Sequence, residues 1–174
     1  GFLGGLVPDL DMYVGHRKTL HYPVYYAALA APAVLAALVA PSHLTVGVAF
    51  LLLGAALHSV ADMYGGGLEL RPWEGNSDRA VYNHYRGSWI APRQFVRYDG
   101  AVEDLALSVG LALPLLFLLD GRLQQVVLGT VAVAAGYTAL RRSLADLAGR
   151  LVPYAPDAVS PFLPDRYFDD EPER

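Results

Sequence analysis

Charged residues are absent from three long stretches of this 174-residue chain, and this segregation limits the folds that it can adopt. Asp, Glu, Lys and Arg are missing from 19–61, 105–119 and 123–140. A helix needs about 20 mainly apolar residues to cross a bilayer. The first stretch is long enough for two such helices, with a turn at Pro41-Ser42-His43 between them. Together the stretches predict helices at roughly 23–40, 44–63, 102–119 and 123–140.

These helices predict an all-α, multi-pass membrane protein in which four transmembrane helices form two short-turn hairpins. Their apolarity is uniform, because 35–39 and 48–53 contain no polar residue. A helix on the surface of a soluble protein has a polar stripe instead. The alternative is a soluble all-α protein with very apolar buried helices, since apolar stretches of about 10 to 14 residues also occur in protein cores.

The basic residues predict how the helices are oriented. Four spans place both chain ends and the middle segment, 64–101, on one side with twelve Lys and Arg residues, and leave only Arg122 on the other. Basic residues favour the cytoplasmic side of a membrane. We therefore expect a cell-membrane protein whose termini and middle segment face the cytoplasm. Tyr22, Tyr25 and Tyr26 open the first helix, where aromatic side chains commonly meet the membrane interface.

Two domains follow from this pattern. A membrane-embedded helical domain is expected over 1–142, and 143–174 is expected to be an amphipathic and acidic C-terminal tail. The stretch 144–152 predicts an interfacial or packed helix, prolines then interrupt regular structure, and 169–174 is predicted to be disordered. Glu103 and Asp104 are expected in the first turn of the third helix, where acidic residues interact favourably with the helix dipole.

Composition excludes several classes of function. The chain contains no Cys, so it can form neither a disulfide, a thiolate metal site nor a cysteine nucleophile. Its formal net charge of −4 at pH 7 argues against nucleic-acid binding, for which a basic surface is typical. The expected partners are membrane lipids and a small-molecule or lipid substrate, and no nucleic acid.

Two polar clusters carry the strongest chemical signal. In the first, Asp9 and Asp11 follow Pro8, and two histidines lie a few residues further on. In the second, His58 and Asp62 stand four residues apart at the end of the second predicted helix, so both project from one helical face. The first helix begins, and the second ends, on the same side of the membrane. The two clusters are therefore expected to converge on one site.

A divalent metal ion is the expected ligand of this site. Imidazole and carboxylate groups together suit Zn best, with Mn or Fe as alternatives, and suit Mg or Ca less. The candidate ligands are Asp9, Asp11, His16, His21, His58 and Asp62. Six ligands would fit one octahedral ion, or two ions bridged by a carboxylate. Each cluster also has a structural explanation, because an aspartate after a proline can close a turn and basic residues can contact lipid headgroups.

Two motifs, GLVPDLD at 5–11 and HRKTLH at 16–21, resemble the inner-membrane family of membrane-bound metal-dependent hydrolases. That family shows a similar G-x-x-P-D-x-D stretch, then H-R-x-x-x-H, and a His and an Asp at the end of a later membrane helix. The resemblance implies a metal-assisted hydrolase with the same six residues as its site. The position of Thr19 departs from the family pattern, and 64–101 has no counterpart in it. A more remote likeness to zinc-dependent phospholipases C points to phosphoester substrates.

The expected function is hydrolysis of an ester or phosphoester, such as that of a lipid-like molecule, at the cytoplasmic membrane face, with Arg17 and Lys18 binding an anionic headgroup. One alternative is a non-enzymatic membrane protein with a structural or sensory metal site. Another is a lipid-binding or partner-docking surface without metal. In the middle segment, five arginines either bind a phosphate or anchor the chain at the interface: Arg71, Arg79, Arg86, Arg93 and Arg97. Three glycines, 65–67, predict a flexible break or the close approach of a substrate.

Overall fold

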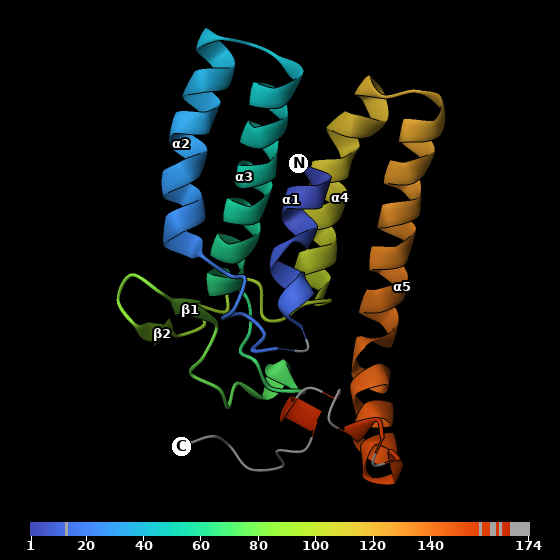
Figure 1. Cartoon of the computed structure of the whole chain (residues 1–174). Coiled ribbons are helices and arrows are strands. Elements are labelled where there is room, and N and C mark those ends of the chain that lie inside the picture. The colour runs from blue at the N-terminus through green and yellow to red at the C-terminus, as the bar shows by residue number, and fades with distance from the viewer. Residues whose placement is uncertain (13, 157, 161–162, 164, 168–174) are drawn as a thin grey trace.

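The computed structural model describes residues 1–12, 14–156, 158–160, 163 and 165–167, and most of these are helical. Two helical hairpins stand side by side (Figure 1). In the first, α2 (Pro23–Val39) packs along α3 (His43–Ala61). In the second, α4 (Val102–Leu118) packs along α5 (Gly121–Leu151). The tight turns of both hairpins lie at one end of the molecule, and the middle segment lies at the other (Figure 1).

Short elements gather at this second end, which we call the polar end. They include five 3-10 turns: Pro8–Asp11, Asp62–Tyr64, Pro72–Glu74, Val152–Tyr154 and Asp165–Tyr167. The short helix α1 (Phe2–Leu6) packs alongside α3 and leads into the first of these turns (Figure 1). An antiparallel hairpin of β1 (Val81–Asn83) and β2 (Ser88–Ile90) pairs Tyr82 with Trp89. The prediction of an all-α chain is thus confirmed as a mostly helical one, with this hairpin as a departure from it.

The helix boundaries follow local chemistry. Ser42 caps α3 through a capping box, in which its side chain accepts from the Thr45 N–H and the Thr45 hydroxyl accepts from the Ser42 N–H. Glu103 and Asp104 lie in the first turn of α4, as expected. The helix α5 continues eleven residues past its predicted end at 140, because the amphipathic stretch that was expected to form a separate helix extends it without interruption. The acidic tail at 169–174 lies outside the described residues.

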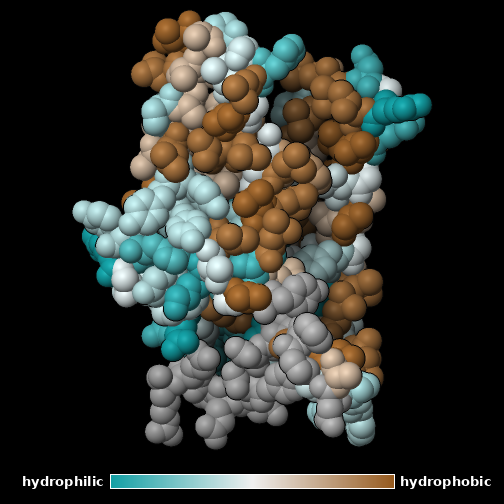
Figure 2. Space-filling model, in the orientation of Figure 1, coloured by the Kyte–Doolittle hydropathy of each residue, from teal (hydrophilic) through white to brown (hydrophobic). Residues whose placement is uncertain are grey.

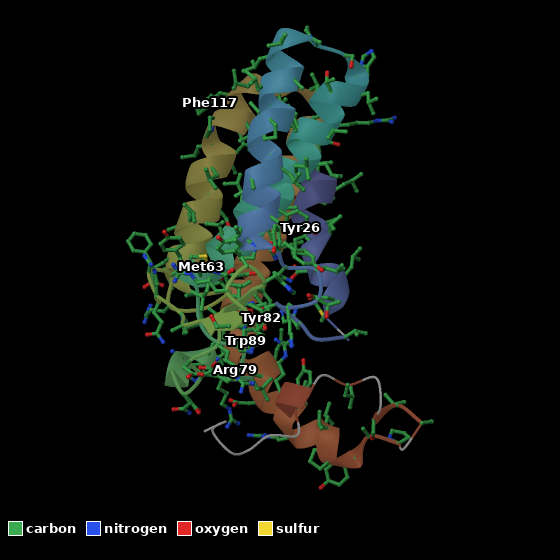
Figure 3. All side chains as sticks on the ribbon, turned by 60° about the vertical axis from the view of Figure 1, so that its left-hand side comes forward. Tyr26, Met63, Arg79, Tyr82, Trp89 and Phe117 are labelled. Atoms are coloured by element: carbon green, nitrogen blue, oxygen red, sulfur yellow. The ribbon has the colours of Figure 1, made fainter. Side chains whose placement is uncertain are left out.

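Small residues fill the interior of the molecule, and large apolar side chains lie on its surface. Most of the buried apolar residues are alanines, among them Ala30, Ala49, Ala55, Ala112 and Ala145. Large apolar side chains face outward along the hairpins, and Phe117 is 87% exposed near the tip of α4 (Figure 3). The brown, hydrophobic surface covers the helical part in Figure 2, and the hydrophilic residues gather over the β-hairpin. Membrane helices commonly pack through small residues in this way.

Two helices are long and apolar enough to cross a membrane, His43–Tyr64 and Gly121–Tyr154. In the most apolar window of the second, none of the residues is buried within the molecule. The helix α2 is apolar but has only 17 residues, because Pro23 and the turn before Ser42 bound it. The structure therefore supports two membrane-length helices among the described residues, and not the four that the sequence predicts.

The middle segment is fastened to α5 by a buried arginine. Arg141 is 8% exposed, and its guanidinium donates to the Asp99 carboxylate at 3.3 Å and to the Leu70 carbonyl at 3.4 Å. The Tyr137 hydroxyl donates to Asp99 at 2.6 Å. These contacts hold the second hairpin against the segment that follows the candidate site.

Candidate metal centre

Three segments bring the candidate residues together at the polar end. Asp9 and Asp11 lie on the 3-10 turn after α1, and His21 immediately precedes the first turn of α2. His58 lies in the last turns of α3, and Asp62 is its C-terminal capping residue. Their convergence depends on α1, which packs against α3 and delivers Asp9 next to His58. The sequence prediction that the two clusters meet on one side of the molecule agrees with this geometry.

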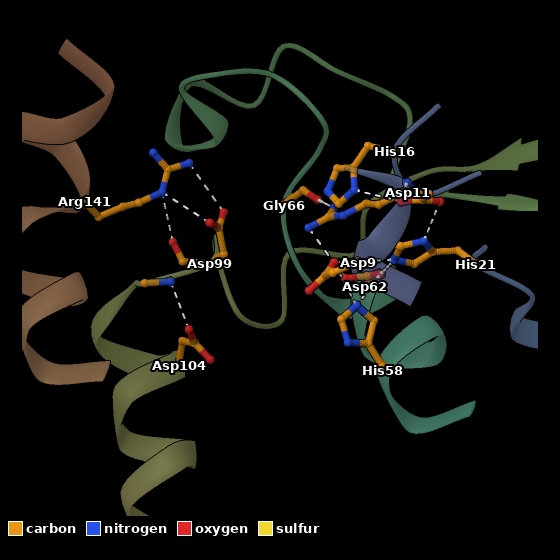
Figure 4. Close-up of polar contacts among 12 residues, drawn as sticks. Asp9, Asp11, His16, His21, His58, Asp62, Gly66, Asp99, Asp104 and Arg141 are labelled. Atoms are coloured by element: carbon orange, nitrogen blue, oxygen red, sulfur yellow. Dashed lines mark hydrogen bonds and ion pairs between the residues drawn. The ribbon is translucent and has the colours of Figure 1, made fainter. Parts of the chain in front are cut away.

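The side chains of Asp9, His21, His58 and Asp62 lie close together (Figure 4). His21 Nε2 lies 3.1 Å from Asp62 Oδ2 and 3.9 Å from Asp9 Oδ1. His58 Nε2 lies 3.3 Å from Asp9 Oδ1 and 3.7 Å from Asp62 Oδ2. Ligand atoms about 2.0–2.1 Å from a tetrahedral ion stand about 3.3 Å apart. Asp9, His21 and His58 present ligand atoms that all lie within 4.8 Å of one another, and together they could hold a metal ion. Asp62 lies beside this group, with its Oδ2 near both histidines.

Two buried atoms lack the partners that such atoms usually have. His21 Nε2 and Asp62 Oδ2 are buried and have no hydrogen-bond partner among the described residues, although they lie only 3.1 Å apart. The Asp11 carboxylate faces His21 Nδ1 at 3.0 Å, so Nδ1 carries a hydrogen and Nε2 is the nitrogen that a metal ion would bind. Two acceptors at this distance require a cation or a proton between them. The residues present thus fit a bound divalent cation.

Asp11 is the orienting group of the site. It is 2% exposed, and its Oδ1 lies 3.1 Å from His16 Nδ1 and accepts from the Arg17 N–H at 3.3 Å. Its Oδ2 accepts from the Leu20 N–H at 2.9 Å and faces His21 as described. Both oxygens are committed to these contacts, which hold the loop and the ring plane of His21. Carboxylates behind metal-binding histidines commonly do this.

His16, Arg17 and Lys18 lie around the four atoms without joining them. His16 is turned toward Asp11 and is not among the residues whose ligand atoms group together. The Arg17 guanidinium donates to the Gly66 carbonyl at 2.9 Å and lies 3.5 Å from Asp62 Oδ1. It therefore neutralises Asp62. Binding of an anionic headgroup by Arg17 stays a prediction. Lys18 is exposed, with its ammonium group 4.8 Å from the centre of the Tyr82 ring.

The electrostatics of the N-terminal cluster favour metal-binding protonation states. Burial raises the pKa of Asp9, but the neighbouring His58, His16 and His21 outweigh it and hold this pKa below its ordinary value. Burial and the charge of Arg17 lower the pKa of His16, and the contact with Asp11 only partly opposes them. Asp9 is therefore a carboxylate and His16 a neutral imidazole at neutral pH.

The centre is most exposed at Asp9, and the side chain of His58 is 21% exposed as well. The side chain of His21 is fully buried and that of Asp62 is 14% exposed, whereas that of Asp9 is 42% exposed. A molecule from solvent can therefore reach the four ligand atoms past Asp9. Sites that act on a substrate keep such an open position, and closed sites are typical of structural ions.

Two residues near the site have roles that sequence reasoning missed. Gly66 is buried, and a Cβ there would come within 3.0 Å of the Arg97 carbonyl, so its small size serves packing of the chain against itself. His84 Nε2 donates to the Lys18 carbonyl at 2.6 Å, and the centre of its ring lies 4.4 Å from that of Tyr22. Since a carbonyl only accepts, the His84 nitrogen is the donor. His84 thereby fastens the β-hairpin to the loop that carries the site.

No protein-family model, no curated protein and no solved structure matches this chain.

Replacing Asp11 by Asn is expected to lower metal affinity about 10- to 100-fold, as the loss of an outer-shell partner usually does. The NH₂ group of the new amide would face N–H donors that now face a carboxylate oxygen, such as that of Leu20. The lost hydrogen bonds are expected to cost about 1–3 kcal/mol in stability. Metal competition titration and thermal unfolding measure the two effects. Asp78→Asn, at an exposed position of the middle segment, is the matched control and should change neither. Unchanged affinity in Asp11→Asn would rule out the orienting role.

Proposed function

We propose that this chain is an integral membrane, metal-dependent hydrolase that acts on an ester or phosphoester at the cytoplasmic face of the membrane. The observation that carries the proposal is the grouping of Asp9, His21 and His58 ligand atoms, with Asp62 beside the two histidines and Asp9 the most exposed member. The motifs at 5–11 and 16–21, which resemble those of membrane-bound metal-dependent hydrolases, support the same function. Zn is the ion that this donor set favours.

The residues of the site divide the work. His21, His58 and Asp62 are the more enclosed ligands, and Asp9 is the ligand next to the entrance. When bound, a divalent ion supplies Lewis acidity, which polarises the scissile ester and makes water a better nucleophile. Asp9 is the exposed carboxylate beside the entering water, and its second oxygen is placed to accept a proton. Arg17 balances the charge of Asp62 and keeps that side chain in position.

Metal loading and hydrolysis test the enzyme. The full chain, purified in detergent, is expected to retain about one Zn ion and to hydrolyse members of an ester and phosphodiester panel. Chelation should abolish turnover, and Zn should restore it. Turnover that survives complete removal of metal would contradict the proposal.

A structural metal is the second candidate, because the ligands join the turn after α1, the start of α2 and the end of α3. An ion there would fasten three segments together. Loss of helix packing on chelation, without turnover of any ester, would favour this role. A site that stays empty in metal-replete protein would instead favour a lipid-binding or docking surface.

The absence of cysteine allows the proposed membrane orientation to be tested directly. Single cysteines are introduced as Arg122→Cys, at the hairpin tip, and Ser88→Cys, in β2 at the polar end. A membrane-impermeant maleimide should label position 122 in intact cells, and position 88 only after permeabilisation. The reverse pattern, or equal labelling of both, would contradict a cytoplasmic polar end.

A further inference from the structure

A second polar site lies at the polar end, in a pocket of ≈ 130 Å³ lined by Pro72, Trp73, Gln94, Arg97, Tyr98 and Arg142. Its volume is several times that needed for one water molecule, so it admits a polyatomic ion. The rings of Trp73 and Tyr98 meet edge to face with their centres 5.5 Å apart and form one wall. We call this the Trp73 pocket.

Arg142 provides the available charge of the Trp73 pocket. Its guanidinium lies 5.3 Å from the centre of the Trp73 ring and 5.9 Å from that of Tyr98. Within the described part of the chain, it has no hydrogen bond or ion pair to a side chain. The other arginine, Arg97, is held bidentately by Glu103 at 2.8 and 3.2 Å, so its charge is balanced. The five N–H donors of Arg142 are therefore left for a ligand.

Gln94 contributes an uncharged hydrogen-bond donor to the pocket from a different segment of the chain than Arg142 does. Its side-chain amide is exposed, and its backbone has a φ of 49°, in the left-handed region that a residue other than glycine rarely adopts. The only other residue of this kind among those described is Arg17, in the metal centre. Backbone strain of this type concentrates at functional sites. Here it accompanies a hydrogen bond from the Gln94 N–H to the Gly65 carbonyl at 3.2 Å.

The Trp73 pocket and the metal centre share a backbone wall. The segment that carries Gln94 pairs with the residues directly after Asp62, since the Arg93 N–H donates to the Met63 carbonyl at 2.9 Å and the Val96 N–H to the Tyr64 carbonyl at 3.0 Å. Gly66 packs against Pro72 and Tyr98, while its carbonyl accepts from Arg17. Gly66 thus contacts both the lining of the Trp73 pocket and Arg17, which pairs with Asp62 beside the metal centre.

We propose that the Trp73 pocket binds the phosphate group of an anionic ligand, with Arg142 as its charged contact and Gln94 as a second donor. An arginine fork matches phosphate bidentately. A tetrahedral anion can accept hydrogen bonds from donors on two walls at once, whereas a planar carboxylate cannot span them as well. The Arg142 guanidinium lies within cation–π distance of both the Trp73 and the Tyr98 ring. Phosphate binding by the pocket does not depend on the proposed function. Its biological role does, because in a hydrolase the pocket would hold a non-reacting phosphate of the substrate.

Trp73 provides the readout, because the chain has only one other tryptophan, Trp89. The full chain carrying Trp89→Phe is studied in a maltoside detergent, which contains no phosphate. Inorganic phosphate is titrated with chelator present, so that the metal centre does not contribute, and calorimetry checks the affinity. Phosphate is expected to change Trp73 emission saturably, and acetate to bind at least tenfold more weakly.

Variants of Arg142 identify the charged contact. Arg142→Gln is expected to weaken phosphate binding about 10- to 100-fold, the effect of losing charge-assisted hydrogen bonds. Arg142→Lys keeps the charge but loses the fork and should be intermediate. Arg150→Gln, on the exposed surface of the same helix, is the matched control and should bind as the parent does. Thermal unfolding confirms that all variants are folded.

Mixed micelles distinguish the source of the phosphate. Phosphatidic acid is compared with diacylglycerol, which lacks the phosphate. A response to phosphatidic acid and not to inorganic phosphate assigns the Trp73 pocket to a lipid headgroup, and a response to both assigns it to the phosphate group alone. No response to either, equal binding of acetate, or unchanged binding in Arg142→Gln overturns the proposal.

The two proposals fail separately. If phosphate binding depends on Arg142 but the protein hydrolyses no ester, the phosphate-site proposal stands and the hydrolase proposal fails. If the protein shows metal-dependent hydrolysis that Arg142→Gln does not alter, and it fails to bind phosphate, the hydrolase proposal stands and the phosphate-site proposal fails.

Discussion

Replacing His58 by alanine is expected to lower the affinity of the purified protein for Zn by about a hundredfold or more, because the loss of an outer-shell partner alone costs about 10- to 100-fold. His58 Nε2 is one of the four atoms around the candidate centre, 3.3 Å from Asp9 and 3.7 Å from Asp62. Removing the imidazole leaves two carboxylates and one histidine. Elemental analysis of detergent-purified protein and competition with a chromophoric chelator measure the change.

The matched control for this variant is His43→Ala. His43 is the first residue of α3, so it belongs to the same helix but lies at the opposite end, beside the hairpin turn. Its replacement should leave metal content and affinity unchanged. Full Zn occupancy in His58→Ala would show that the four-atom centre is not the metal site.

The second large effect is expected at Gly54, where α1 and α3 come into backbone contact. A Cβ on Gly54 would collide with the Gly1 carbonyl oxygen and lie 2.8 Å from the Gly5 nitrogen. Gly54→Ala must therefore push α1 away, which costs about 1–3 kcal/mol, as overpacking does. This displacement also moves Asp9, because the turn that carries it directly follows α1. We expect a lower Tm and weaker metal binding together.

The same substitution at Gly47, seven residues earlier in α3, is the control. No atom lies within 4 Å of a Cβ built there. Because alanine is the better helix former by about 1 kcal/mol, Gly47→Ala should be neutral or stabilising. A second matched pair is Gly4→Ala, whose Cβ would meet the Leu51 backbone, and Gly5→Ala, which has open space. If Gly54→Ala and Gly47→Ala melt alike, close packing of α1 does not support the site.

The helices could be predicted because their signal is local. A charge-free stretch must be helical wherever its backbone is removed from water, and Pro41 and Ser42 mark a turn in any environment. The predicted start of α2 at Pro23 and of α4 at Val102 agree with the structure. The end of α5 could not be predicted in the same way, because the change from an apolar to an amphipathic stretch alters which face is covered and not the backbone conformation.

The candidate site could likewise be predicted only in part from the sequence. The residue types alone identified the six His and Asp candidates. The four-residue spacing of His58 and Asp62 placed these two on one helical face. The sequence could not separate Asp11, whose oxygens face the loop N–H groups and two histidines, from Asp9, which faces the open side. That distinction depends on which donors surround each carboxylate. Arg17 likewise has its partner in Asp62, far along the chain.

The sequence by itself determined where the chain is helical, which end is polar and which side chains can bind a metal, because apolar periodicity, charge and ligand chemistry belong to single residues and their neighbours. Only the tertiary structure decided which atoms share one point and which donors remain available. The close approach of α1 to Gly54 sets Asp9 beside His58, and the pairing of 93–96 with 63–65 builds the Trp73 pocket next to the metal centre. Both follow from contacts between distant segments, whose geometry is fixed by packing rather than by local preference.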